Sequence, residues 1–211
     1  MEEAKIVNLY DLTHTQAAPL LSTWEYPWEA LSGIGDFILE LGKTLSEEEY
    51  DRPSENVWIA KSAKVYPNTY IAGPAIIGPR TEVRPGAFIR GKALVGADCV
   101  VGNSTELKNV ILFDNVLVPH YNYVGDSILG YKSHMGAGSI TSNVKSDKTL
   151  VVVRDGKEEI ATGLKKMGAM LGDFVEVGCG SVLNPGTVIG RHSNVSVSYT
   201  HLRAHETELH L

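Results

Sequence analysis

Residues 59–107 read IAKSAKVYPNTYIAGPAIIGPRTEVRPGAFIRGKALVGADCVVGNSTEL, and every sixth residue of this segment is aliphatic. The aliphatic positions are Ile59, Val65, Ile71, Ile77, Val83, Ile89, Val95, Val101 and Leu107. The residue two places before each of the last eight is small, namely Ala63, Thr69, Ala75, Thr81, Ala87, Ala93, Cys99 and Thr105. A period of six matches neither an α-helix nor a simple strand alternation. It predicts a hexapeptide-repeat β-helix, in which each unit forms one side of a triangular coil and its aliphatic side chain points inward.

The repeat continues after Leu107 with two irregular steps. The next aliphatic positions are Leu112, Val118, Val124, Leu129 and Met135, so the steps from 107 to 112 and from 124 to 129 contain five residues. A shortened unit tightens a corner of the coil, and irregular repeats often carry the binding face of a solenoid. The period resumes at Leu171, Val177, Leu183, Ile189 and Val195. We therefore predict an all-β, single-stranded parallel β-helix over residues 57–141 and 167–196.

Residues 142–166 interrupt the solenoid. Two β-prone runs, 149–153 and 158–160, flank the dipeptide Asp155-Gly156. Asp-Gly between two such runs is typical of a tight hairpin turn. We expect an inserted β-hairpin arm that leaves the coil and lies over a neighbouring site.

The two ends of the chain differ from the repeat. In residues 1–56, apolar residues recur at three- and four-residue spacing, with breaks at Pro27 and at Gly33–Gly35. This pattern predicts a helical attachment on the first coils, most simply a structural cap for the open end of the solenoid. Residues 197–211 obey no repeat and resemble a translated sequencing-library adapter. We interpret them as a sequencing artefact and assign no metal site to their histidines.

The composition argues against several classes of function. The net charge of −6 gives no global attraction to nucleic acid or to an anionic membrane, so phosphate binding would need locally placed Arg and Lys. The two cysteines, Cys99 and Cys179, lie far apart in the chain and form no disulfide framework. No signal peptide and no long apolar run is present. We expect a soluble, cytoplasmic protein.

The polar residues that depart from the repeat gather between residues 107 and 143. His120 lies in the stretch VPHYNYVGD, Lys108 in ELKN and Arg84 in VRPGAF. A lone histidine is more often structural than catalytic, and two cations alone often form only a solvated surface. Cations beside one neutral base make chemical sense when the substrate carries a phosphate and an amine that must lose a proton.

Residues 77–143 also resemble a known family. The motifs IGPRTEVRPGAF, VGNSTELKN, PHYNYVGDS and MGAGSITSNVKSD are similar to the left-handed β-helix acetyltransferase domain of bifunctional glucosamine-1-phosphate acetyltransferase/uridyltransferase, especially its archaeal-type relatives. The later stretch GLKKMGAMLGDFVEVGCGSVLNPGTVIG resembles relatives that carry the hairpin insertion. The nucleotidyltransferase domain of those relatives has no counterpart here, so we expect no pyrophosphorylase activity.

The resemblance implies a role for individual residues. His120 occupies the position of the general base. Arg84, Lys108 and Tyr123 occupy sugar-phosphate contacts. Ala137 and Asn143 occupy acetyl-CoA contacts, with the Ala137 backbone N–H as an oxyanion donor. Two positions depart from the family pattern, because His134 replaces a substrate-contacting asparagine and Cys179 replaces a serine that meets the cofactor.

The implied reaction is direct acetyl transfer from acetyl-CoA to an amine, with no metal required. The resemblance also implies a homotrimer with sites between adjacent subunits, an arrangement that a closed three-fold ring permits. Three alternatives stay open: an acyltransferase for another sugar or nucleotide-sugar acceptor, a non-catalytic trimeric scaffold, and a zinc hydratase of the same fold. The last needs three histidine ligands, and His120 and His134 are widely spaced in the sequence, without the closer histidine pair of that class.

Overall fold

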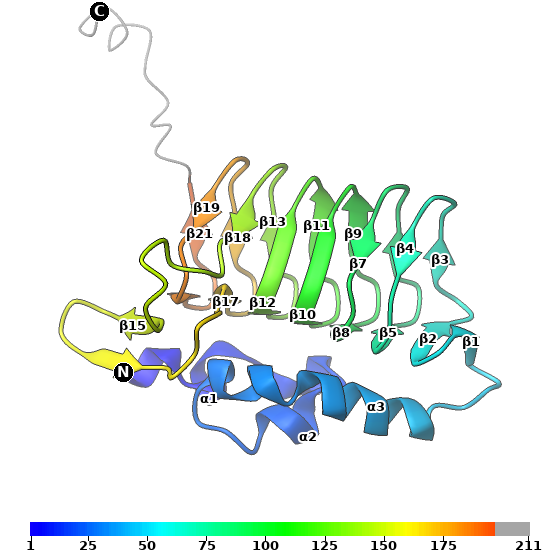
Figure 1. Ribbon diagram of the computed structural model, residues 1–211, viewed down its shortest axis with the longest axis horizontal. Coiled ribbons are helices and arrows are strands. Elements are labelled where there is room, and N and C mark those ends of the chain that lie inside the picture. The colour runs from blue at the N-terminus through cyan, green and yellow to red at the C-terminus, as the bar shows by residue number, and fades with distance from the viewer. Residues whose placement is uncertain (197–211) are drawn as a thin grey trace, which may run out of the picture.

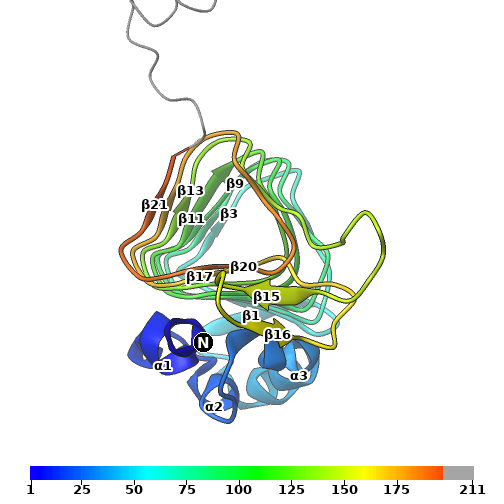
Figure 2. The same cartoon turned by 90° about the vertical axis from the view of Figure 1, so that its left-hand side faces the viewer.

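The computed structural model describes residues 1–196, which form one left-handed parallel β-helix with helices along one side (Figure 1). Viewed along its axis, the solenoid is a triangular prism (Figure 2). This confirms the fold predicted from the six-residue period. None of the helices in this part of the chain is long and apolar enough to cross a membrane.

Each turn of the coil contributes strands to three faces. Face 1 contains β2 (Val57–Ala60), β5 (Ala75–Ile77), β8 (Ala93–Val95), the second halves of β10 (Glu106–Leu112) and β12 (Tyr123–Leu129), β17 (Ala169–Leu171) and β20 (Thr187–Ile189). Face 2 contains β3 (Lys64–Val65), β6 (Glu82–Val83), β9 (Val100–Asn103), β11 (Leu117–His120), β13 (His134–Met135), β18 (Glu176–Val177) and β21 (Asn194–Val195). Face 3 contains β4 (Tyr70–Ile71), β7 (Phe88–Ile89), the first halves of β10 and β12, β14 (Ile140–Thr141) and β19 (Val182–Leu183).

The inward aliphatic column fills the prism. Val83 pairs with Val101 in the next turn and both side chains are fully buried, so residues of the same repeat position stack directly on one another. The small residues beside this column are also buried. The Thr81 hydroxyl donates to the Gly96 carbonyl oxygen at 2.7 Å, which satisfies a polar group inside an apolar core.

The corner between faces 3 and 1 is shortened twice. Ile89 pairs with Leu107 and Ala93 pairs with Val110, so β10 turns this corner with one residue fewer than the preceding coil. β12 keeps the same short corner. Asn109 and Asp126 occupy the bends with φ of 54° and 49°, a left-handed conformation that Asn and Asp tolerate better than most residues. The missing residue at this corner is the physical form of the two five-residue steps in the sequence, because the longer corner also bends left-handed at Lys92, with φ of 52°.

The N-terminal helices lie along the length of face 1 (Figures 1 and 2). They are η1 (Glu2–Ala4), α1 (Ile6–Leu9), η2 (Leu12–His14), α2 (Ala18–Leu21), η3 (Pro27–Ser32) and α3 (Ile34–Thr44). Our sequence-based expectation of a cap on the first coils differs from this arrangement. The first-turn aliphatics Ile59, Val65 and Ile71 are only half-buried, and the strand that covers an edge is β1 (Tyr50–Ser54), antiparallel to β2.

The reason for the lengthwise position is a second apolar column. The outward side chains of face 1 are also buried and apolar, namely Trp58, Ile76, Leu94, Ile111, Ile128 and Met170. A sheet that is apolar on both sides must be covered on both sides. The helices supply this cover with buried residues that include Leu9, Leu21, Trp28, Leu31, Ile34 and Ile38.

The inserted segment forms a two-stranded antiparallel hairpin. β15 (Val152–Arg154) pairs with β16 (Glu159–Ala161) around the Asp155-Gly156 turn. The Asp155 carboxylate accepts the backbone N–H groups of Lys157 and Glu158, both at 2.8 Å, which closes the turn. The arm extends from the corner between faces 3 and 1 toward the N-terminal helices (Figure 2).

Candidate functional site

Three of the predicted residues lie on the corner between faces 2 and 3. His120 is the last residue of β11, Ala137 follows β13 and Cys179 follows β18. Because Leu117 pairs with His134 and Met135 pairs with Val177, these three residues occupy the same position in successive turns. The Gly138 N–H donates to the His120 carbonyl oxygen at 3.0 Å, and the Gly180 N–H donates to that of Ala137 at 2.8 Å. All three side chains are exposed along one edge.

A buried amide holds this edge together. Asn122, 2% exposed, accepts the His120 N–H through Oδ1 at 3.1 Å. Its Nδ2 donates to the Gly136 carbonyl oxygen at 2.8 Å and to the Ser139 hydroxyl at 3.1 Å. One side chain inside the prism therefore joins the turn of His120 to the turn of Ala137. We did not predict this role for Asn122, because its position in the repeat is otherwise one for small residues.

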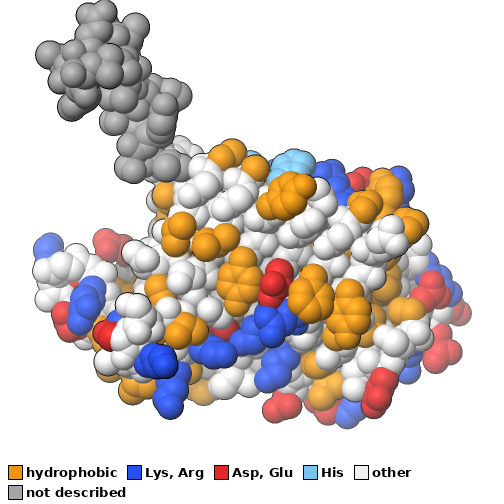
Figure 3. All heavy atoms as spheres, turned by 45° about the horizontal axis from the view of Figure 1, so that its top comes forward, with side chains coloured by type: hydrophobic (Ala, Val, Ile, Leu, Met, Phe, Trp, Pro, Cys, Tyr) orange, Lys and Arg blue, Asp and Glu red, His pale blue; other side chains and the backbone are white. Residues whose placement is uncertain are grey.

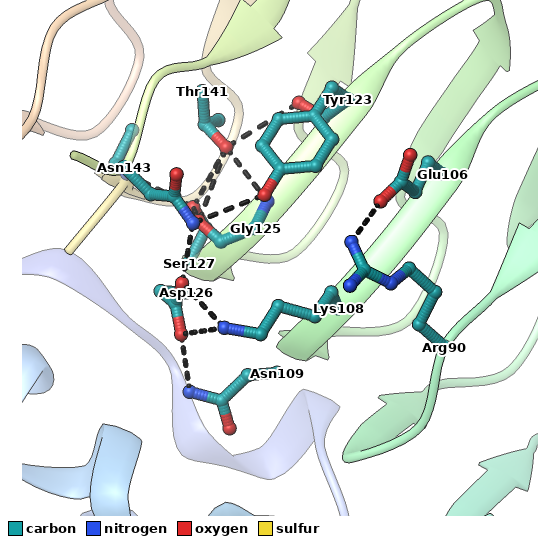
Figure 4. Close-up of polar contacts among 11 residues, drawn as sticks. Arg90, Glu106, Lys108, Asn109, Tyr123, Gly125, Asp126, Ser127, Thr141 and Asn143 are labelled. Carbon is teal, nitrogen blue, oxygen red and sulfur yellow. Dashed lines mark hydrogen bonds and ion pairs between the residues drawn. The ribbon is translucent and has the colours of Figure 1, made fainter. Parts of the chain in front are cut away.

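A second cluster lies on face 3 and its corner with face 1 (Figure 4). The Lys108 ammonium contacts both oxygens of Asp126, at 3.1 and 3.0 Å. Asn143 donates to the other side of the same carboxylate at 2.6 Å and to the Tyr123 hydroxyl at 3.1 Å. Asn109 donates to Asp126 Oδ1 at 2.9 Å. The structure thus brings Lys108, Tyr123 and Asn143 into one network.

Asp126 is the centre of this network, and its side chain is only 6% exposed. A buried carboxylate needs compensating charge and donors, which Lys108 and the two asparagines supply. Burial raises the pKa of Tyr123, so its hydroxyl remains protonated and can donate to a ligand. The sequence contains a signal for the network, because Asn109, Asp126 and Asn143 recur at a constant interval that matches one shortened turn of the coil.

Arg84 and His134 lie on the outside of face 2. Arg84 Nε contacts Glu82 Oε2 at 3.2 Å, and His134 Nδ1 contacts Glu176 Oε2 at 2.8 Å. Within residues 1–196, neither side chain hydrogen-bonds to the His120 edge or to the Asp126 network. The same part of the chain contains no group of three His, Cys, Asp or Glu side chains arranged to hold a metal ion.

Residues 71–203 match the protein family described as the GMPPB C-terminal domain. The chain belongs to this family. The bifunctional protein GlmU of Methanococcus maripaludis is 35% identical over 175 residues, which cover 82% of this chain and 42% of that protein. The bifunctional sugar-1-phosphate nucleotidylyltransferase/acetyltransferase of Sulfurisphaera tokodaii is 31% identical over 165 residues, which cover 78% of this chain and 38% of that protein.

These relatives confirm the family resemblance that the motifs between residues 77 and 143 indicated. The chain spans less than half the length of either relative. Among solved structures, the hexapeptide transferase family protein from Anaplasma phagocytophilum is similar, with a TM-score of 0.48 and 19% identity, over 64% of this chain and 74% of that chain.

Proposed function

We propose that this chain transfers an acetyl group from acetyl-CoA to the amine of an amino-sugar phosphate such as glucosamine-1-phosphate. The observation that carries the proposal is the exposed edge on which His120 and Ala137 stack in successive turns, with the Asp126 network on the adjoining face. The relatives named above support acetyl transfer as the reaction class.

In this proposal His120 is the general base. Its neutral imidazole takes a proton from the amine as the amine nitrogen attacks the thioester carbonyl carbon. A C–N bond forms, the C–S bond breaks and the CoA thiolate leaves. The Ala137 N–H donates to no group within residues 1–196, so it is free to donate to the developing oxyanion. Asn143 and Cys179, which lie at the two corners of face 3, would contact acetyl-CoA.

The phosphate of the acceptor would meet the cationic residues. Lys108 is held by Asp126 in a fixed direction, which reduces the entropy lost when it binds a phosphate. Tyr123 and Arg84 would complete the sugar-phosphate contacts. Because the His120 edge is exposed and the Lys108 side chain is partly exposed, we further propose that a homotrimer closes each site with an adjacent subunit.

The test is a thiol-release assay with acetyl-CoA and glucosamine-1-phosphate. Loss of a general base typically costs about 10²–10⁴-fold, so we expect His120→Ala to lower kcat by that order. His192→Ala is the matched control, because His192 stacks on Phe174 far along the chain from this edge and its removal should leave turnover unchanged. Equal turnover in wild type and His120→Ala would refute the role of His120.

The alternative for which the structure gives a reason is acetyl transfer to a different acceptor molecule. His134, whose Nδ1 contacts Glu176 Oε2 at 2.8 Å, presents an imidazole where the family pattern has an asparagine. A panel of amino sugars, sugar phosphates and nucleotide sugars would separate the two acyltransferase hypotheses. Activity on none of them, with no acetyl-CoA binding, would instead favour a non-catalytic trimeric scaffold.

A further inference from the structure

A pocket of about 320 Å³ lies beside the shortened corner between faces 3 and 1. Its lining residues are Gly73, Pro74, Arg90, Gly91, Lys92, Lys108, Asn109 and Asp126. The two coils before β10 turn this corner with one residue more, so their corners project beyond the recessed bends at Asn109 and Asp126. The pocket is the step between the long and the short corners.

The charges that line this step favour an anion. Arg90 pairs with Glu106 at 2.7 Å and Lys108 pairs with Asp126 at 3.0 Å. Lys92 forms no ion pair with any group of residues 1–196, and its aliphatic stem packs against Gly35 of α3. Three cations thus converge on a pocket that contains one carboxylate of its own.

Two exposed aromatic rings lie on the same face as this cationic pocket. Tyr70 and Phe88 are 59% and 42% exposed, and their ring centroids are 5.4 Å apart. The Arg90 guanidinium lies 5.9 Å from the Phe88 ring centroid, which places the aromatic pair next to the pocket. Figure 3 shows this face, with a row of apolar side chains running beside a band of Lys and Arg. Exposed aromatic rings beside cations are the usual way to stack a base and hold its phosphates.

We propose that this groove binds a nucleoside diphosphate, with the diphosphate on Arg90, Lys92 and Lys108 and the base over Tyr70 and Phe88. This goes beyond the proposed function, which requires a single phosphate near Lys108. The nucleoside diphosphate has two possible sources, a nucleotide-linked amino-sugar acceptor or a free nucleotide effector. The pocket and His120 lie at opposite corners of face 3. Face 3 is about three strand residues wide, which is about 10 Å, so a sugar attached to the diphosphate could span it.

The experiment is calorimetric titration of the full chain with UDP and with GDP, with inorganic phosphate as the comparison. We expect at least one nucleoside diphosphate to bind more tightly than phosphate. Lys92→Ala and Phe88→Ala should each weaken that binding about tenfold or more. Lys132→Ala is the matched control, because Lys132 lies over the Tyr131 ring on another corner and its loss should not change the affinity. Binding is measured without acetyl transfer, so this result is independent of the proposed reaction.

The source is identified by kinetics. Inhibition of acetyl transfer that is competitive with the amino sugar would assign the groove to the acceptor, and non-competitive inhibition would assign it to an effector. Two results would overturn the proposal: no binding of UDP or GDP at millimolar concentration, or affinities that Lys92→Ala and Phe88→Ala leave unchanged. Displacement of the nucleotide by CoA would also overturn it, since the groove would then hold the diphosphate of CoA. Sedimentation of Phe88→Ala serves as a check, because a change in subunit assembly with unchanged affinity would assign the ring to a subunit contact.

Discussion

At the scale of single residues, the interior of the coil performs more than packing. Asn122 replaces a small residue in the buried column and uses both ends of its amide to join the His120 turn to the Gly136–Ser139 turn. In Asn122→Ala, the partly buried N–H of His120 loses its acceptor, while the Gly136 carbonyl oxygen keeps the Ser139 hydroxyl at 2.7 Å. An unsatisfied donor of this kind costs about 1–3 kcal/mol, so the free energy of unfolding should fall by about that amount.

The same substitution should also affect catalysis under the proposed function. Displacement of a catalytic group by about 1 Å can cost about 10²-fold, so we expect kcat of the folded Asn122→Ala protein to fall by about 10–100-fold. Urea denaturation and the thiol-release assay measure the two effects. Asn194→Ala, at an exposed strand position, is the control and should change neither. An Asn122→Ala protein with wild-type stability would show that water replaces the amide.

The candidate residues differ in how far the sequence could predict them. The six-residue period places His120, Ala137 and Cys179 at equivalent corner positions, so their alignment is readable from spacing. The constant interval of Asn109, Asp126 and Asn143 indicates that they align in successive turns. Their contacts depend on the geometry of the shortened corner, which the spacing alone does not specify. Arg84 and His134 lie outside both clusters because they point away from the prism, next to the inward residues Val83 and Met135.

At the scale of elements, helix α3 is fitted to face 1 at one glycine. A Cβ atom at Gly42 would lie 2.4 Å from the Trp58 ring, which is closer than any real contact, and Trp58 is itself 5% exposed. Gly42→Ala should therefore force the helix away from the sheet and lower the free energy of unfolding by about 1–3 kcal/mol, as overpacking typically does. Thermal denaturation measures the change.

Gly35→Ala on the same helix is the matched comparison. A Cβ there would meet only the flexible side chain of Lys92, at 3.2 Å. Alanine is favoured over glycine in a helix by about 1 kcal/mol, so this variant should be as stable as wild type or more stable. If both substitutions lowered the free energy of unfolding equally, the requirement for glycine would come from the flexibility of the helix and not from the contact with Trp58.

The position of the helices also shows what a periodic pattern leaves out. The spacing of apolar residues predicted helical pieces in the N-terminal segment, residues 1–56, but it did not indicate where they dock. That information lies in the outward positions of face 1, such as Ile76, Leu94 and Ile111, which are apolar and buried. The equivalent positions of face 2 include charged residues such as Glu82 and Glu176. Each outward residue is adjacent to an inward aliphatic, so a count of every sixth residue does not include them.

At the scale of the whole molecule, the N-terminal segment connects turns that do not contact each other. In a solenoid, each repeat contacts only its neighbours, and local unfolding can start at either end. Here α3 lies against the strands β5, β8 and β10, while the residues before η2 reach later turns. The Asp173 N–H donates to the Leu9 carbonyl oxygen at 3.0 Å, and the Asp173 carboxylate accepts the Asp11 N–H at 2.7 Å. The helices therefore act as a brace between early and late coils.

Asp173→Ala tests this brace without removing the apolar cover of face 1. The Asp173 side chain is fully buried. Its carboxylate also accepts the Tyr131 N–H at 2.9 Å and pairs with Arg191 at 3.1 Å. Removal of this carboxylate leaves these donors unpaired and frees the segment around Asp11. Native-state hydrogen exchange should show faster exchange in β17 and β20, while β5 and β8 keep their protection. Asp98→Ala removes an exposed pair with Arg80, which is worth at most about 1 kcal/mol, and should leave the pattern unchanged. Equal acceleration of exchange in all turns by Asp173→Ala would contradict the role of the brace. The solenoid would then unfold as one unit with or without it, because contacts between neighbouring turns alone are sufficient for cooperativity.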